Sequence, residues 1–272
     1  MIQIAKNLYQ YRELITELAW KNIIVRYKQS YLGILWAVIK PIMLMLIFTL
    51  VRSFVGIETD GVPYPLLTFA ALIPWVFFQE STSEGVISIT SHAPLIKKIY
   101  FPREVFPLTA MVTKLVELLI SFIILAGMMA YYHYLPSIYA LWIPAIIFYA
   151  MVVALTISFF GAAMNVYYRD VAQALPVGLS LMMYGSPVMY PLALVHKKLI
   201  EEQAAGEWSE RLYMLYTLNP LAGIIDSFQR ALFKNLPPDM DALYPGLILT
   251  LAVLPFSYLY FKRAENWFAD VI

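Results

Sequence analysis

Long apolar segments alternate with shorter polar ones along this chain of 272 residues. Each apolar segment has roughly the 20 residues that a helix needs to cross the hydrocarbon core of a membrane. Continuous runs of this length are unlike barrel strands, so the spans are predicted to be helices. We expect an all-α integral membrane protein with one transmembrane domain over residues 1–272. Its six predicted spans are residues 33–54, 65–90, 109–131, 138–163, 172–192 and 243–261.

The segment before the first span has a different pattern. Apolar side chains recur at helical spacing from Ile4 to Leu18, and Lys, Arg and Glu fill the positions between them. This pattern predicts an amphipathic helix over residues 4–28 that lies in the membrane interface. The alternative is a helix packed on a partner protein.

The segment 193–241 is long, mixed in charge and interrupted by prolines. Its apolar part, residues 212–225, is too short to span and is typical of a re-entrant or interfacial helix. We expect two short helices at the outer mouth of the fifth span, one of them over residues 221–234. The residues singled out in this segment are Asn219, Pro220, Asp226 and Arg230.

Composition agrees with a membrane protein, since 61% of the residues are hydrophobic, only 14% are charged and the mean hydropathy is +0.69. The absence of cysteine excludes disulfides and thiolate metal sites. The three histidines lie far apart, and no glycine is followed by lysine as a phosphate-binding loop requires. We therefore expect no catalytic residue, no metal site and no bound cofactor in this chain, and no nucleic-acid partner.

The distribution of basic residues predicts the orientation in the membrane. The loops 55–64 and 132–137 contain no Lys or Arg, and we place them outside. The segments on the other side are rich in basic residues, which identifies that side as cytoplasmic and places both termini there. These basic residues are Lys6, Arg12, Lys21, Arg26, Lys28, Lys97, Lys98, Arg103, Arg169, Lys262 and Arg263.

The cytoplasmic loop 94–107 combines prolines, basic residues and aromatic residues. Its three prolines force a broken path, because a helix tends to end before each one. We expect a short basic and aromatic helix that docks on a partner. A plain positive-inside loop would explain the charges, but not the dense prolines and aromatics. The docking candidates are Leu95, Ile96, Lys97, Lys98, Tyr100, Phe101, Pro102 and Arg103, with Arg169 and Asp170 in the next cytoplasmic turn.

Several ionisable residues lie within predicted spans, where they are costly and often functional. Glu80 and Glu84 share one helical face, as do Lys114 and Glu117. We expect the second and third spans to pair these groups near the cytoplasmic mouth, with a proton relay as the alternative. Lys40 and Arg52 are expected to extend toward the ends of the first span.

Aromatic residues make up 15% of the chain, and many lie in the spans. Their faces suit the C–H faces of sugars, and tyrosine hydroxyls suit sugar hydroxyls. Some of them are therefore candidates to line a conduit for a large, uncharged, hydroxyl-rich substrate. These candidates are Trp75, Phe77, Tyr149, Phe159, Tyr184 and Tyr190.

Together these motifs resemble the membrane subunit of type-2 ABC exporters, above all the polysaccharide-export permeases for O-antigen, capsule and teichoic acid. The order and spacing of the motifs give the resemblance its specificity, and O-antigen export is the nearest type. His92 departs from the asparagine expected at its position. The matching motifs include Arg26-Tyr27-Lys28-Gln29-Ser30, Leu35-Trp36, Pro74-Trp75, Tyr100-Phe101-Pro102-Arg103, Tyr168-Arg169-Asp170-Val171, Ser186-Pro187-Val188, Asn219-Pro220 and Phe261-Lys262-Arg263-Ala264-Glu265.

The resemblance implies a bacterial inner-membrane homodimer with two separate ATPase subunits, which bind Mg-ATP. It implies that the loop 94–107 holds the helix that couples to the ATPase, and that 193–241 forms an outer gate. The implied substrate is a polysaccharide on a polyprenyl diphosphate, which crosses at the dimer interface. Arg26, Lys28 and Arg103 are candidates to meet the diphosphate at the inner mouth.

Two alternatives to polysaccharide export remain open. One is a drug or small-lipid exporter permease of the same superfamily. The other is a membrane-embedded glycosyl- or acyltransferase, which would need a catalytic carboxylate or histidine cluster. Glu80 and Glu84 are the only candidates for such a cluster.

Overall fold

The protein is described by a computed structural model that covers residues 10–28, 33–56, 61–99, 101–201 and 207–272. Within these ranges the regular elements are all helical, as predicted. The first part of the predicted interfacial helix, before residue 10, and the docking candidate Tyr100 lie outside the described residues.

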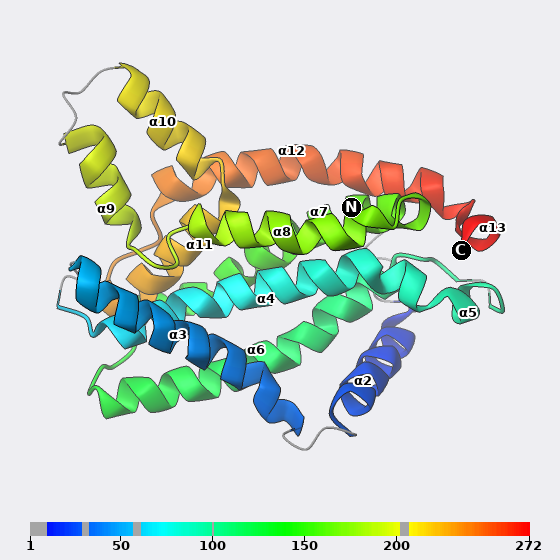
Figure 1. Cartoon of the computed structure of the whole chain (residues 1–272), viewed down its shortest axis with the longest axis horizontal. Helices are drawn as coiled ribbons and strands as arrows, with labels where there is room; N and C mark the ends of the chain where they lie inside the picture. Colours follow the sequence, from blue (N-terminus) through cyan, green and yellow to red (C-terminus); the bar gives the residue numbers. More distant parts are fainter. Residues whose placement is uncertain (1–9, 29–32, 57–60, 100, 202–206) are drawn as a thin grey trace.

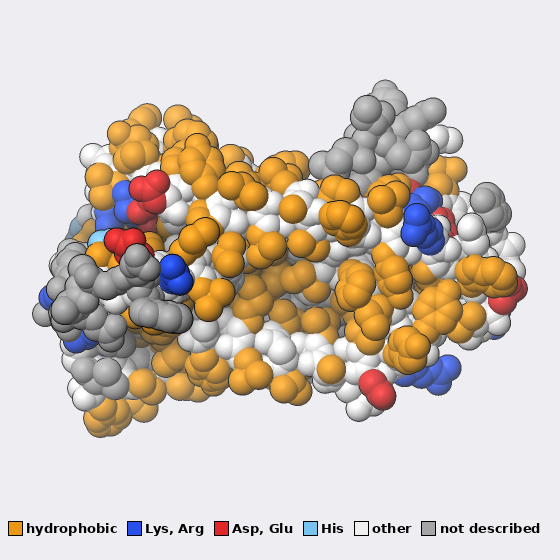
Figure 2. Space-filling view, turned by 90° about the horizontal axis from the view of Figure 1, so that it is seen from above, with side chains coloured by type: hydrophobic (Ala, Val, Ile, Leu, Met, Phe, Trp, Pro, Cys, Tyr) orange, Lys and Arg blue, Asp and Glu red, His pale blue; other side chains and the backbone are white. Residues whose placement is uncertain are grey.

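Among the described residues, four helical segments are long and apolar enough to cross a membrane: Trp36–Phe54, Val105–Tyr131, Ile138–Tyr167 and Met240–Glu265. They correspond to α3 (Trp36–Val55), α6 (Val105–Tyr131), α7 (Ile143–Tyr167, preceded by a 3₁₀ turn) and α12 (Met240–Glu265). They run roughly along the long axis of the molecule (Figure 1). Charged side chains gather toward the two ends of that axis, and apolar side chains cover the middle (Figure 2). This distribution fits a bundle that spans a membrane.

The other two predicted spans are helices of a different kind. α4 (Tyr64–Ser91) is as long as the four above, but its outward-facing surface is small, because it packs against α3, α6, α7, α8 and α11. α8 (Asp170–Tyr184) has 15 residues and ends before residue 192, where the span was predicted to end. The chain leaves the helix at Gly185, and Pro187 has no N–H with which to continue it. Whether α4 and α8 complete a set of six spans stays a prediction.

The contact between α4 and α7 depends on small residues. A Cβ atom on Gly85 would lie 2.2 Å from Oγ of Ser158, and one on Gly161 would lie 2.6 Å from Cγ2 of Val86. Small residues at such positions let two helix backbones approach closely, which is how helices associate in a membrane. Gly85 and Gly161 therefore set the distance between the two most extensively packed helices.

α2 (Arg12–Lys28) lies at a steep angle to the bundle, near the end that holds α5 (Ala93–Ile96) (Figure 1). It buries Ile15, Leu18 and Ala19 and leaves Trp20 and Val25 exposed. This arrangement is compatible with a helix that lies along a membrane surface. The interfacial location itself stays a prediction.

The segment 193–241 folds at the opposite end of the bundle. It contains α9 (Leu192–His196), a π turn (Lys197–Glu201), α10 (Glu207–Thr217), α11 (Pro220–Gln229) and a second π turn (Arg230–Lys234). α11 with its π turn matches the helix predicted over 221–234. Two short helices were predicted, whereas the described part of the segment has three. α11 packs closely on α12, since a Cβ atom on Gly246 would lie 2.6 Å from Cα of Pro220.

We predict that Gly85→Ala and Gly161→Ala each lower the stability of the bundle by about 1–3 kcal/mol, because the added methyl group overpacks the α4–α7 contact. Thermal unfolding of the purified protein, followed by tryptophan fluorescence, measures this effect. Gly127→Ala is the matched control, since a Cβ atom there meets no atom within 4 Å. Equal melting temperatures for all three variants would contradict the packing argument.

Candidate functional site

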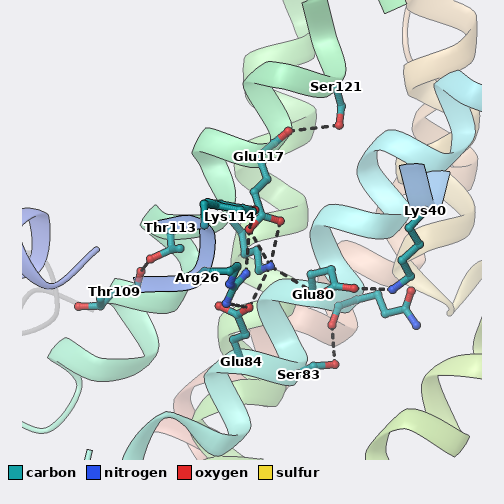
Figure 3. Close-up of polar contacts among 12 residues, drawn as sticks. Arg26, Lys40, Glu80, Ser83, Glu84, Thr109, Thr113, Lys114, Glu117 and Ser121 are labelled. Carbon is teal, nitrogen blue, oxygen red and sulfur yellow. Dashed lines mark hydrogen bonds and ion pairs between the residues drawn. The ribbon is translucent and has the colours of Figure 1, made fainter. Parts of the chain in front are cut away.

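Six charged side chains from four helices form one ionic network, which we call the charge cluster (Figure 3). α2 contributes one cation, α3 another, α4 two carboxylates, and α6 a cation and a carboxylate. Three positive charges thus face three negative ones. The cluster consists of Arg26, Lys40, Glu80, Glu84, Lys114 and Glu117.

Lys114 is the centre of the charge cluster. Its Nζ atom lies 2.9 Å from Oε1 of Glu84, 2.9 Å from Oε2 of Glu117 and 3.5 Å from Oε2 of Glu80. Its side chain is only 3% exposed, so these carboxylates replace the water that the ammonium group has lost. The pairing that the sequence predicted between the second and third spans is confirmed.

Arg26 joins α2 to the same carboxylates. Its Nη1 atom donates to Oε1 of Glu117 at 2.8 Å, its Nη2 atom donates to Glu84, and the hydroxyl of Tyr27 donates to Glu117 at 2.9 Å. Lys40 on α3 pairs with Glu80. These two contacts were not predicted, because they depend on how α2 and α3 fold back onto α4 and α6.

Cavities flank the charge cluster on two sides of Arg26. One, of about 280 Å³, is lined by Trp36, Lys40 and Glu80 among others. The second, of about 380 Å³, reaches Glu84 and His92. Apart from Lys21 in the second cavity, the charged side chains that line the two cavities are already paired. This arrangement is suited to holding helices together and is poorly suited to binding a free anion.

The loop that follows α4 is folded around Arg103. This residue is buried, and its Nη1 and Nη2 atoms donate to the carbonyl oxygens of Ile99 at 3.0 Å and Ile96 at 3.2 Å. Its guanidinium group also lies over the ring of Phe101, 5.5 Å from the ring centre. Arg103 and Phe101 thus stabilise the loop from inside, and Ile96 is buried as well.

The outer surface of this loop is formed by Pro94, Lys97, Lys98 and Ile99, all of which are exposed. Leu95 and Pro102 are half-buried between this surface and the core. Ile99 lies next to Lys97 and Lys98 on top of the buried part of the loop. Together these residues form a small surface that is partly apolar and partly basic. We call it the docking surface after the role predicted for this loop, which stays a prediction.

The loop is fastened to the end of α12 by a second polar group, which we call the loop clamp. Glu104, at the start of α6, is fully buried and accepts hydrogen bonds from Nζ of Lys262 at 2.9 Å and from the hydroxyl of Tyr258 at 3.3 Å. Glu265 accepts a hydrogen bond from the backbone N–H of Arg103 at 2.8 Å and pairs with Lys262. The docking surface and the end of α12 therefore form one body.

The turn between α7 and α8 lies at the same end of the molecule. Arg169 and Asp170 are exposed in this turn. Asn165 holds its base, since its Oδ1 atom accepts a hydrogen bond from the N–H of Ala172 at 3.1 Å and its Nδ2 atom donates to Oγ1 of Thr90 at 3.3 Å. This role of Asn165 was not predicted, although the side chain is typical of a helix start.

The aromatic candidates separate into two groups. Trp75, Phe77, Tyr149 and Phe159 are buried within this single chain, and their rings contribute to its core. Tyr184 is 59% exposed at the end of α8. Tyr190 is half-buried and donates its hydroxyl to the carbonyl oxygen of Tyr184 at 3.0 Å.

The candidates of the outer segment lie around the start of α11. Asn219 caps this helix by accepting a hydrogen bond from the N–H of Leu221 at 3.1 Å, and its Nδ2 atom donates to Oγ of Ser186 at 2.8 Å. Pro220 occupies the first helical position, where its missing N–H has no cost. Asn219 thus connects α11 to the turn after α8.

Asp226 and Arg230 follow on α11 and its π turn. Nε of Arg230 lies 3.9 Å from Oδ2 of Asp226, whereas its Nη1 atom lies 3.0 Å from Oδ2 of Asp239, the residue that caps α12. The i,i+4 pair expected from the sequence is therefore the longer contact of the two. Asp226 is 6% exposed, and its burial raises the pKa of its carboxyl group to about 6.

The described residues contain no group of three or more His, Asp or Glu side chains placed to hold a metal ion. The carboxylates of the charge cluster are each paired with a lysine or arginine instead.

We predict that Lys114→Met lowers the stability by about 3 kcal/mol, because it removes the buried central cation from three partly buried carboxylates. Lys40→Met should cost less than about 1 kcal/mol, because Lys40 is 47% exposed and solvent screens its pair. Thermal unfolding compares the two variants. Adding Glu84→Gln to Lys114→Met should restore part of the loss, and no restoration would contradict a charge-balanced network.

We predict that the contribution of Asp226 to the stability of the protein falls as the pH rises from about 4 to about 6. In this range the folded chain keeps the proton of Asp226, whereas the unfolded chain has lost it, so folding opposes ionisation. Asp226→Asn should therefore raise the stability by about 1–3 kcal/mol at pH 7.5 and have a smaller effect at pH 5. Melting temperatures at the two pH values test this. A stabilisation that is the same at both would show that charge burial is not the cause.

Comparison with known proteins gives a family that agrees with this geometry. The ABC-2 type transporter family model matches residues 13–202. A protein named O-antigen export system permease protein RfbA from Myxococcus xanthus is 28% identical over 273 residues, which cover 100% of both chains. One of the same name from Klebsiella pneumoniae is 28% identical over 270 residues, which cover 97% of this chain and 98% of that protein. The chain therefore belongs to the ABC-2 type transporter family of membrane proteins.

Proposed function

We propose that this protein is the permease subunit of an ATP-driven exporter that moves a polyprenyl-diphosphate-linked polysaccharide, of the O-antigen type, across the bacterial inner membrane. The main support is the full-length similarity to relatives named O-antigen export permeases. Because the similarity extends over both chains from end to end, it includes the helical bundle and the segment 193–241 together.

A separate ATPase supplies the energy in this proposal, and Mg-ATP binds to that subunit. The docking surface of Pro94, Lys97, Lys98 and Ile99 is the part of this chain that contacts it, together with Arg169 and Asp170. The loop clamp supports this assignment, because its hydrogen bonds join the loop to α6 and α12. A displacement of the loop by the ATPase would therefore move these two helices. On this basis the end with α5 and α13 (Phe268–Val271) faces the cytoplasm.

Two copies of the chain enclose the conduit in this proposal. α8 is the helix best suited to line it, since Leu179 is its one residue classed as buried and its free surface includes Gln173, Ser180 and Tyr184. Val177 and Leu181 are exposed on α8 as well, so its free surface is mixed, and its polar side chains are the ones suited to a hydrated saccharide. Tyr184 and Tyr190 are the aromatic residues that we assign to this path.

The diphosphate of the carrier lipid needs a cation that is not already committed. Lys28 is exposed in the last turn of α2 and is our first candidate. Arg26 would have to leave Glu84 and Glu117, and Arg103 would have to leave two carbonyl oxygens. We therefore assign Arg26 to holding α2 in place and Arg103 to the loop.

The helices α9 to α11 lie at the opposite end and form the outer gate in this proposal (Figure 1). The hydrogen bond from Asn219 to Ser186 links the gate to the end of α8. A movement of α8 would therefore move the start of α11 with it.

The test is made in a strain from which the gene has been deleted. We predict that deletion abolishes the surface polysaccharide and leaves lipid-linked polysaccharide inside the cell, and that the native gene restores export. Lys97→Glu with Lys98→Glu should fail to restore it and should lose co-purification of the ATPase subunit, because the docking surface changes its charge. Immunoblotting of surface and internal polysaccharide measures the outcome.

The matched control is Lys197→Glu with Lys198→Glu, the same dipeptide at the opposite end of the molecule, which should keep the ATPase subunit bound. Surface polysaccharide that persists after deletion would refute the proposed substrate and favour a drug or small-lipid exporter. Loss of the ATPase in both double variants would refute the docking surface.

A further inference from the structure

An apolar groove runs along the outside of the bundle between α7 and α12, away from the charge cluster and the loop. Its volume is about 650 Å³, and its walls include Ile157, Phe160, Val253, Phe256 and Leu259. The part of α12 that lines it extends from Val253 to Arg263, roughly 15 Å at 1.5 Å per residue. The groove is thus long, narrow and apolar over most of its length.

One end of the groove is lined by a positively charged residue, Arg263. Arg263 lines it there, is exposed, and has no acidic side chain within ion-pair distance among the described residues. Its neighbour Lys262 points the other way, into the loop clamp with Glu104. Two adjacent basic residues therefore have different surroundings: one is neutralised inside the bundle, and the other faces the groove.

The floor of the groove contains the hydroxyl groups of Thr156 and Ser257. Thr156 donates its hydroxyl to the carbonyl oxygen of Val152 at 2.8 Å. The rings of Phe160 and Tyr260 lie 5.1 Å apart and form part of the wall. A ligand of this groove therefore needs a long apolar part, and one anionic group at the end where Arg263 lies.

We propose that this groove binds one anionic phospholipid, with an acyl chain along α12 and its phosphate against Arg263. Charge complementarity supports this occupant, because basic residues at the membrane boundary attract anionic head groups and an arginine fork fits a phosphate. Under the orientation proposed above, this is a lipid of the cytoplasmic leaflet. The saccharide is not involved, so the site is separate from the export path.

The experiment uses the full-length purified protein with added phosphatidylglycerol or phosphatidylcholine, and native mass spectrometry counts the retained lipid. We expect wild-type protein to retain phosphatidylglycerol in preference to phosphatidylcholine. Arg263→Gln should lower the retention of phosphatidylglycerol about tenfold, because one charge-assisted contact is lost. Val253→Trp should lower the retention of both lipids, because the indole fills the apolar end.

Two matched variants control for charge and bulk. Arg12→Gln removes an exposed arginine outside the groove, and Leu249→Trp adds an indole to an exposed position of α12 that does not line it. Both should retain lipid as the wild type does. Arg263 and Val253, the two groove residues that are changed, are exposed in the native protein. A melting curve identifies any variant that fails to fold.

Wild-type retention in Arg263→Gln, or equal retention of the two lipids by the native protein, would overturn the proposal. A dimer that dissociates in Val253→Trp, seen by light scattering, would also overturn it, since the groove would then be an interface between copies. Retention is measured without nucleotide or saccharide. A failure here therefore leaves the proposed export function to its own test.

Discussion

The structure depends on pairing the buried ammonium group of Lys114 inside an apolar bundle. An unpaired buried cation is costly, so the fold must bring carboxylates to it. α4 supplies Glu80 and Glu84, and α6 itself supplies Glu117. Arg26 from α2 balances part of the remaining negative charge, and Lys40 from α3 pairs with Glu80 at the most exposed edge of the charge cluster. The need to pair the buried Lys114 thus brings α4 and α6 together, and Arg26 adds α2 to them.

α6 connects this charge cluster to the loop clamp. Glu104 immediately precedes the helix and is held by Lys262, while Lys114 and Glu117 lie further along it. The two polar groups therefore share one rigid helix, and both lie toward the end of the molecule that holds α5. The opposite end is organised differently, with capping contacts such as Asn219 and close packing of α11 on α12 at Gly246. The end that holds α5 is therefore stabilised by ion pairs, whereas the opposite end is stabilised by the close packing of helix backbones.

The parts of the site that depend on residues close together in the sequence were predictable. Glu80 and Glu84, and likewise Lys114 and Glu117, share helical faces, and their pairing follows from opposite charge on adjacent spans. Asn219-Pro220 marks a helix start that the structure has. The roles of Arg26 and Arg103 were not predictable in this way. Both are basic residues near a membrane boundary, and only the folded chain shows that one is paired with carboxylates and the other with carbonyl oxygens.

By itself, the sequence determined the helical class, most of the helix positions and the separation of basic from acidic loops. These properties depend on hydrophobic length and on charge near the boundary, both of which are local. The tertiary structure decided which of the apolar and aromatic residues face the core, since Trp75 and Tyr184 have similar sequence surroundings and opposite exposure. It also decided that the half-buried Lys262 is paired in the loop clamp while Arg263 faces a groove. Adjacent residues on a helix point about 100° apart, and what each one meets depends on the helices packed around it.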